Sequence, residues 1–283
     1  MNKDEIKYLE LMQSILSFGF ERFDRTGVGT VGTFGSNLSF SLSNNKIPLL
    51  TTKKVFARGV IEELLFFIRG ETNTKKLEEK NVNIWKGNSS REFLDSRGLN
   101  DYNEGQIGPM YGYLWRNFQG IDQLSNALSL IKNDPFSRRI MVSAYDPSVS
   151  HKCALDPCHL FFQFYVNNGK LYLQWYQRSV DYFLGLPFNI ASYAILLKLF
   201  AKATKLEPGK ILFVGGDTHI YKNHINQVYE QLTREPYEFP ELYIDKSVET
   251  IEDMEKLSFN DFRIENYKYH PAIKADMAIK EKL

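Results

Sequence analysis

The chain has 283 residues, of which 43% are hydrophobic and 14% aromatic, so it can bury a large core. Its 35 basic and 34 acidic side chains nearly cancel, which excludes a general electrostatic field for nucleic acid or an anionic membrane. The N-terminus lacks the apolar segment of a signal peptide, and the longest apolar run, residues 190–201, falls short of a membrane span. We therefore expect a soluble, cytoplasmic protein.

Hydrophobic periodicity predicts a mixture of helices and strands in the first half of the chain. Helices are expected over residues 6–16, 60–68 and 122–132, and strands over 33–42 and 140–145. Gly70 follows the second helix, where a left-handed cap residue would end it. No linker interrupts this pattern, so a single domain over 1–283 is predicted.

The clearest local signal is a β-hairpin in the second half. Two aromatic-rich runs, 159–166 and 170–177, are joined through Asn168-Gly169, a pair that favours a type I′ turn. An apolar helix over 189–204, a strand over 211–214 and a final helix over 219–232 complete the prediction. Strands and helices do not alternate regularly, which favours an α+β fold with one large, mostly buried sheet.

Two motifs are rejected. Residues 27–32 read Gly-Val-Gly-Thr-Val-Gly, but a dinucleotide fingerprint must follow a strand and open a helix, whereas this run precedes a predicted strand. His151 and His159 lie near the two cysteines, yet no second ligand pair stands at metal spacing. We expect neither a nicotinamide site nor a metal site.

Cys158 stands just before the first hairpin strand and is the candidate nucleophile. Two-residue closure of the hairpin would set His159 opposite Arg178 and Cys158 opposite Ser179. A thiol near a guanidinium has its thiolate stabilised, but strict alternation puts Cys158 and Arg178 on opposite faces, so a bulge is needed. The same alternation separates Cys158 from His159, which argues against a cysteine hydrolase.

Several residues have plain structural interpretations as well. Asp181 and Asn189 flank a Gly-Pro turn and could be helix caps. Arg138 and Arg139 follow a turn signal and are expected to enter a strand, where adjacent side chains point to opposite faces. Exposure of the strand edge to solvent, or an ion pair, would account for these two arginines.

Many short segments together resemble the thymidylate synthase family. They keep the family's order from about Arg25 to Ile279 and comprise Arg25-Thr26-Gly27, Glu63-Leu64-Leu65, Ile84-Trp85, Gly108-Pro109-Met110-Tyr111-Gly112, Asp134 to Ile140, Pro157-Cys158-His159, Tyr176-Gln177-Arg178-Ser179 with Asp181, Leu184 to Tyr193, and Gly216-Asp217-Thr218-His219-Ile220-Tyr221. Phe56 and the insertion around residues 88–98 resemble the eukaryotic branch. The resemblance implies reductive methylation of dUMP to dTMP, a bulged sheet, and a homodimer packed sheet against sheet, with no separate reductase domain.

The resemblance also implies roles for individual residues. The catalytic residues would be Cys158, which adds to C6 of uracil, with Glu63, Tyr111, His159, Asp181 and Asn189. Contacts to dUMP would come from Arg25, Gln177, Arg178, Ser179, Val180, Asp181, Asn189, His219 and Tyr221, and from Arg138 and Arg139 of the other subunit. The folate, 5,10-methylenetetrahydrofolate, would contact Phe56, Ile84, Trp85, Asn88, Leu155, Asp181, Leu184, Gly185, Phe188 and Ala278.

Asp156 departs from the family pattern, which usually has a small or apolar residue there. Its charge could raise the pKa of the Cys158 thiol. The nearest alternative function is a pyrimidine nucleotide hydroxymethylase of the same fold, against which Trp85 and Asn189 argue. A catalytically silent nucleotide-binding protein is the second alternative, and the presence of Cys158, Glu63 and Tyr111 disfavours it.

Overall fold

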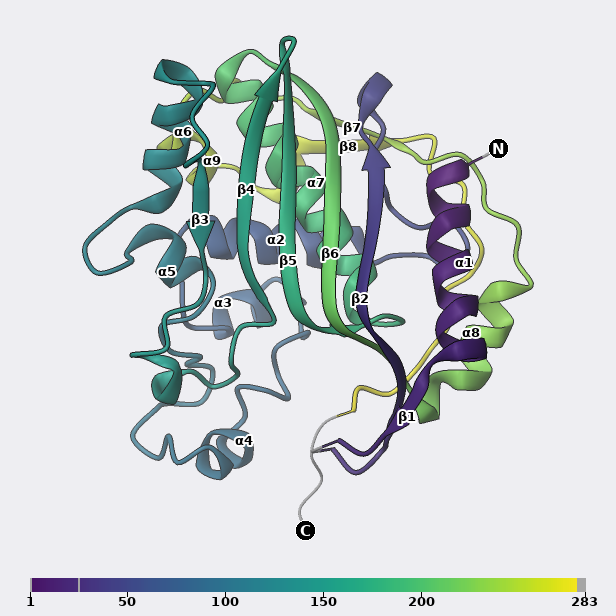
Figure 1. The fold of residues 1–283 in the computed structure, drawn as a ribbon. Coiled ribbons are helices and arrows are strands. Elements are labelled where there is room, and N and C mark those ends of the chain that lie inside the picture. Colours follow the sequence, from purple (N-terminus) through teal and green to yellow (C-terminus); the bar gives the residue numbers. More distant parts are fainter. Residues whose placement is uncertain (1, 25, 279–283) are drawn as a thin grey trace.

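A computed structural model describes residues 2–24 and 26–278 (Figure 1). Its main feature is a six-stranded sheet with the order β1-β2-β6-β5-β4-β3. The strands are β1 Phe20–Arg22, β2 Thr30–Ser41, β3 Met141–Ser143, β4 His159–Asn167, β5 Lys170–Asp181 and β6 Glu207–Tyr221. All neighbours are antiparallel except β5 and β6, so the sheet is mixed. The predicted α+β class is confirmed.

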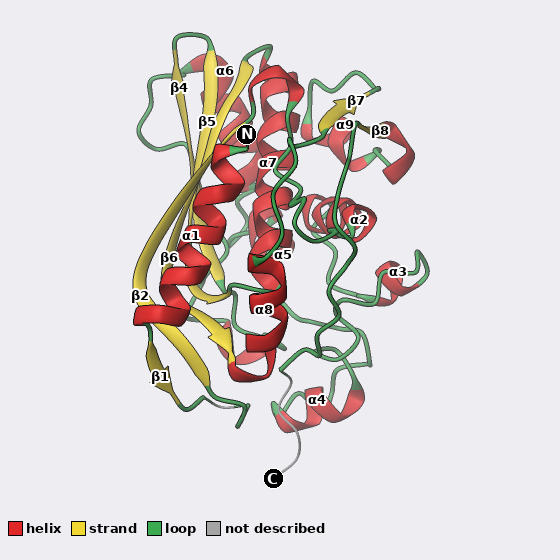
Figure 2. Cartoon of the chain, turned by 90° about the vertical axis from the view of Figure 1, so that its right-hand side faces the viewer, coloured by secondary structure: helices red, strands yellow, loops and turns green. Residues whose placement is uncertain are grey.

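The helices lie on one face of this sheet, and the other face carries none among the described elements (Figure 2). They are α1 Lys3–Phe18, α2 Ala57–Ile68, α3 Lys75–Glu78, α4 Arg91–Ser96, α5 Gly112–Arg116, α6 Gln123–Asn133, α7 Gly185–Thr204, α8 Ile225–Leu232 and α9 Ile251–Glu255. Two short strands, β7 Glu241–Ile244 and β8 Phe262–Glu265, form a separate small sheet.

Helix α7 connects the parallel strands β5 and β6 and forms the centre of the core. Phe200 of α7 stacks on Phe164 of β4 at 4.6 Å, and Tyr193 stacks on Trp175 of β5 at 4.7 Å. Each buried aromatic side chain of this kind contributes about 1.5–3 kcal/mol. Among the described residues only α7 is long and apolar enough to cross a membrane, and 83% of its apolar window is buried inside the protein, as in a core helix.

Most of the predicted elements are confirmed. The N-terminal helix, the strand after the Gly-rich loop, α2 and α6 form where the periodicity placed them, and Gly70 has the left-handed φ of 68°. Asp122 caps α6 by accepting from the Ser125 N–H at 3.1 Å. Asn168 and Gly169 have φ of 48° and 71°, as a type I′ turn requires. The loop at 27–29 leads into β2 and not into a helix, as predicted.

The prediction of a final helix over 219–232 is wrong in two respects. Residues 219–221 belong to a strand, and the helix that forms after them is not the last helix of the chain. Strand β6 continues to Tyr221, because His219 pairs with Gly32 of β2 on one side and with Asp181 of β5 on the other. Two ladders of main-chain hydrogen bonds override the local helical pattern. The helix begins only at Ile225, and α9 follows it.

Two boundaries that bear on the site also differ. Helix α7 begins at Gly185, so Asn189 lies inside the helix and the helix-cap interpretation is wrong. The strand expected over 140–145 is only Met141–Ser143, and Arg138 and Arg139 lie in the turn before it, both exposed.

Candidate functional site

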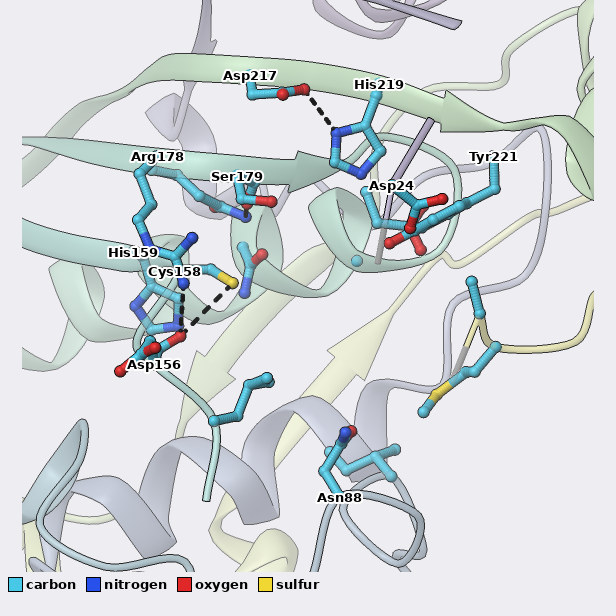
Figure 3. A pocket seen from close by; sticks show the side chains of 18 of the residues that line it. Asp24, Asn88, Asp156, Cys158, His159, Arg178, Ser179, Asp217, His219 and Tyr221 are labelled. Atoms are coloured by element: carbon cyan, nitrogen blue, oxygen red, sulfur yellow. Dashed lines mark hydrogen bonds and ion pairs between the residues drawn. The ribbon is translucent and has the colours of Figure 1, made fainter. Parts of the chain in front are cut away.

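A cavity of about 750 Å³ opens where β4, β5 and β6 meet the starts of α5 and α7 (Figure 3). Seventeen of the predicted site residues line it: Glu63, Ile84, Trp85, Asn88, Tyr111, Leu155, Cys158, His159, Gln177, Arg178, Ser179, Asp181, Gly185, Asn189, His219, Tyr221 and Ala278. They come from segments spread over most of the sequence. The fold therefore brings together residues that the sequence could only group by resemblance.

Several other predicted residues are not part of this wall. Arg25 lies outside the described residues. The other residues predicted but not found in the wall are Phe56, Arg138, Arg139, Val180, Leu184 and Phe188. Val180 is fully buried, so any contact to a ligand would come from its main chain.

Cys158 lies immediately before β4, where an irregularity of the strand pairing brings it next to Arg178. The pairing shifts between His159 and Phe161, so His159 pairs with Gln177 and not with Arg178. The main-chain N–H of Arg178 donates to the Cys158 carbonyl oxygen at 2.8 Å. The predicted register is wrong by one residue, and the predicted bulge, which allows the contact, is confirmed.

The loop that carries the thiol is held from two sides. The Arg178 guanidinium donates through Nε to the Pro157 carbonyl oxygen and through Nη2 to that of Asp156, both at 2.9 Å (Figure 3). The Cys158 N–H donates to the Tyr111 hydroxyl oxygen at 2.8 Å. A cation beside a thiol stabilises the thiolate, which is the reactive form of a nucleophilic cysteine.

Tyr111 reaches Cys158 from an unusual backbone conformation at the start of α5. Its φ is 42° and its ψ is −106°, a combination rarely adopted by residues with a side chain. The ring is buried and stacks on His159 at 4.1 Å. A Cβ atom on the next residue, Gly112, would lie 2.3 Å from the Phe67 carbonyl oxygen, so only glycine allows this approach. Such strain persists where the surroundings fix it, often at functional sites.

His159 is a neutral hydrogen-bonding group. Burial lowers its pKa to about 3. Its Nδ1 lies 2.8 Å from the hydroxyl of Tyr193 on α7. A ring that stays uncharged can relay hydrogen bonds beside the thiol but does not carry an imidazolium charge.

Glu63 of α2 has the properties of a proton-exchanging group. Burial raises its pKa to about 7, while the hydrogen bond from Trp85 Nε1, at 2.7 Å, acts in the opposite direction. A carboxyl group that titrates near neutral pH is suited to general acid–base chemistry.

We expect Glu63→Gln to stabilise the folded protein above neutral pH. In the unfolded chain Glu63 ionises above its ordinary pKa of 4.5, but in the folded protein only above about 7. Between these values the unfolded state binds fewer protons, so the stability of the native chain falls as pH rises. The amide of Gln can still accept from Trp85 and removes this cost.

Denaturant unfolding of both proteins at pH 4.5 and pH 8 measures the effect. The advantage of the variant should grow between these pH values to at most about 3 kcal/mol, less where the cavity exposes the carboxyl to water. An advantage that is the same at both pH values would contradict the raised pKa of Glu63.

The opposite end of the cavity contains polar residues that sequence reasoning missed. Asp217 of β6 pairs with Arg22 at 2.7 Å and with Nδ1 of His219 at 2.9 Å. The carboxylate thereby orients the His219 ring, which the resemblance assigns to dUMP binding. Asp217 lies in one of the segments that resemble the family, so the sequence offered a reason to assign it to the site. Arg22 lies in none of these segments, and nothing in the sequence pointed to it.

Other wall residues were also missed or not assigned to the site. These are Phe23, Asp24, Thr30, Phe67, Phe93, Ser96, Arg97, Asp156 and Met277. In the part of the chain that the structure describes, no three His, Cys, Asp or Glu side chains group together as metal ligands would. Both cysteines are free thiols.

Comparison with known proteins identifies one family. Residues 6–279 match the family profile described as thymidylate synthase. The chain is 46% identical to "Thymidylate synthase" of Saccharomyces cerevisiae, covering 98% of both proteins, and 46% identical to "Thymidylate synthase 1/2" of Encephalitozoon cuniculi, covering 97% of both. It is 47% identical to "Bifunctional dihydrofolate reductase-thymidylate synthase" of Leishmania major, of which it spans 56%.

Proposed function

The chain belongs to the thymidylate synthase family, and on that basis we propose that it converts dUMP to dTMP with 5,10-methylenetetrahydrofolate. The observation that carries the proposal is the placement of Cys158 in the cavity wall, with its loop held by Arg178 and Tyr111. A thiolate fixed in this way can add to an electron-poor ring carbon.

The proposed reaction begins with attack of the Cys158 thiolate on C6 of uracil. This addition makes C5 a nucleophilic, enolate-like carbon that can take up the one-carbon unit. After C5 has bonded to the methylene carbon of the folate, a base removes the C5 proton, which breaks the bond from that carbon to the folate nitrogen and leaves a methylene group on C5. Hydride transfer from the released tetrahydrofolate reduces this group to methyl, the thiolate leaves C6, and the products are dTMP and dihydrofolate.

Proton movement is assigned to the inner wall of the cavity. Glu63, whose pKa of about 7 allows both protonation states, lies in the same wall as the hydroxyl of Tyr111 and neutral His159. We propose that these groups order the water that exchanges protons with the pyrimidine. Tyr111 and His159 are buried, which limits the access of bulk water to this end.

The folate is proposed to occupy the outer part of the cavity. Trp85 and Leu155 offer apolar surface there, and Asn88, Gly185 and Ala278 complete the wall. Asp181 accepts from the main-chain N–H groups of Phe183 and Leu184 at 3.2 and 3.0 Å, which fixes its carboxylate at the entrance to α7.

The phosphate of dUMP requires more positive charge than the described wall offers. Arg22 is paired with Asp217, Arg97 is paired with Asp156, and Arg178 donates two of its N–H groups to main-chain oxygens. A dianion is best held by several guanidinium groups. Arg138 and Arg139 are exposed and form no ion pair with a described residue, so they are available to a second subunit.

A homodimer packed through the helix-free face of the sheet would meet this need. That face exposes large hydrophobic side chains, including Tyr165 of β4 and Met141 of β3, which alternate with buried core residues and are 58% and 46% exposed. Exposed apolar patches of this kind mark association surfaces. We propose that Arg138 and Arg139 reach the partner's cavity across this interface. A cytoplasmic location stays a prediction of the sequence.

Complementation tests the shared site. We expect homodimers of Arg138→Ala and of Cys158→Ser each to lose activity, and their mixture to recover part of it. One site of each heterodimer would receive an intact thiol and an intact arginine. Activity is measured after subunit exchange, which differently tagged subunits verify. No recovery in exchanged heterodimers would contradict the cross-subunit contact.

The product identifies the reaction. Mass spectrometry after incubation with dUMP and methylenetetrahydrofolate should show dTMP. A hydroxymethylated nucleotide would instead support the hydroxymethylase alternative.

A further inference from the structure

An acidic side chain lies two residues before the proposed nucleophile. A carboxylate near Cys158 would repel its thiolate. The Asp156 carboxylate is bound on both sides, however: Oδ2 pairs with Nη2 of Arg97 at 3.7 Å, and Oδ1 accepts a hydrogen bond from the hydroxyl of Ser150. Its main-chain oxygen accepts from Arg178 at 2.9 Å.

Figure 3 shows how Asp156 is turned. The dashed lines from the Cys158 sulfur and from the Arg178 guanidinium both end at its main-chain oxygen, and its carboxylate lies on the far side of that oxygen from the sulfur. One residue therefore presents a neutral carbonyl dipole to the thiol and directs its charge elsewhere.

Arg97 comes from a well-anchored element. It is the C-cap of α4, whose N-cap Ser90 accepts from the Phe93 N–H at 3.2 Å. Phe93 and Leu94 are buried, and the Arg91 guanidinium donates to the Leu99 carbonyl oxygen at 2.9 Å. The insertion around residues 88–98 is therefore folded and anchored, and it places the Arg97 guanidinium beside the loop that carries Cys158.

The two charges oppose each other at a neighbouring thiol. The pKa of Cys153 is raised to about 11, mainly by burial; the Asp156 charge acts in the same direction and the Arg97 charge acts against it. Cys158 lies on the other side of Asp156 in the chain, two residues away.

We propose that Arg97 is a positioning residue for the nucleophile. Together with Ser150 it holds the Asp156 carboxylate away from Cys158 and compensates its charge, which makes an acidic residue tolerable beside a reactive thiol. The proposal rests on the proposed function, because only a catalytic thiolate makes this arrangement matter for turnover.

Other charged or titratable groups also face the thiol. From the elements packed around it these are Arg178 of β5, Tyr111 at the start of α5, His159 of β4 and Glu63 of α2. None of them is changed in the test below. A shift between variants therefore reports on the Arg97–Asp156 pair.

The test is the pH dependence of Cys158 alkylation by iodoacetamide, in a Cys153→Ser background. Below the pKa of the thiol, Arg97→Gln should react about two- to threefold more slowly, a modest factor because both partners of the pair are partly exposed. Asp156→Asn alone should change the rate little. The double variant Arg97→Gln/Asp156→Asn should return to the rate of the background protein.

These alkylation rates distinguish a positioning role of Arg97 from two charges that act independently on the thiol. Independent charges would give Asp156→Asn the same effect in both backgrounds, and that outcome, or an unchanged rate in Arg97→Gln, would overturn the proposal. Arg97→Lys should preserve the rate. Lys75→Gln is the matched control, since Lys75 pairs with Glu104 outside the cavity wall and is 39% exposed, against 38% for Arg97.

Alkylation reports on the thiol whether or not the protein turns over dUMP. If the effects of the two substitutions were additive, the proposed role of Arg97 would be wrong, and the proposed reaction would be unaffected. Absence of dTMP in the product assay of the unmodified protein would remove the proposed function and leave the alkylation result standing.

Discussion

Cys158→Ser is expected to abolish turnover while leaving the fold and dUMP binding nearly unchanged. A serine hydroxyl does not form an alkoxide near neutral pH, so the covalent step is lost, and we expect a fall of roughly 10⁴-fold or more. The Cys158 Sγ donates weakly to the Asp156 main-chain oxygen at 4.0 Å, and the smaller serine hydroxyl fits in the same place. Steady-state assays and calorimetric titration with dUMP measure the two properties separately.

Cys153→Ser is the matched control for this experiment. Its thiol is buried and donates to the carbonyl oxygens of Pro109 and Val149, both at 3.6 Å, and a serine hydroxyl can donate to the same oxygens. The raised pKa of Cys153, about 11, makes it a poor nucleophile. Activity should therefore persist in this variant, and near-normal activity in Cys158→Ser would refute the assignment of the nucleophile.

The parts of the fold that sequence reasoning predicted are those with local causes. The Asn168-Gly169 turn requires positive φ at both residues, and only a few residue types supply it. Asp122 caps α6 through its own side chain, three residues from its partner. Such signals need no knowledge of distant segments.

The parts that escaped prediction depend on contacts between distant segments. Strand β6 extends to Tyr221 because it has a partner on each side, and the sequence of 211–221 does not reveal them. The register shift beside His159 moves Arg178 by one position, which turn counting along the hairpin does not reveal. Elements of this kind are decided by tertiary pairing and not by propensity.

The cavity shows the same division. Family resemblance identified seventeen of its wall residues, but not the charge pairs that support them. Arg22 and Asp217 are 195 positions apart, and Arg97 reaches Asp156 from the insertion around residues 88–98. The resemblance marked Asp156 as a departure, and only the structure shows that its charge is compensated.

Asn189 is the residue expected to determine which pyrimidine is used. Uracil presents O4 as an acceptor and N3–H as a donor, and one amide side chain can match both. Cytosine presents the reverse pair. Asn189 lies in the cavity wall, inside α7, where it has no capping role that would explain its presence otherwise. An unmatched buried group costs roughly 1–3 kcal/mol, so discrimination on the order of a hundredfold is expected.

Asn189→Asp should therefore lose most activity on dUMP and gain measurable binding or turnover of dCMP. The carboxylate cannot donate to O4 of uracil, but it can accept from the amino group of cytosine. Parallel assays of both nucleotides on the purified variant give the ratio of kcat/KM values, and Asn189→Ala shows the effect of losing the side chain without reversing its polarity. If Asn189→Asp kept the dUMP preference of the unmodified protein, the pyrimidine would have to be read elsewhere, and Gln177, buried in the same wall, would be the next residue to test.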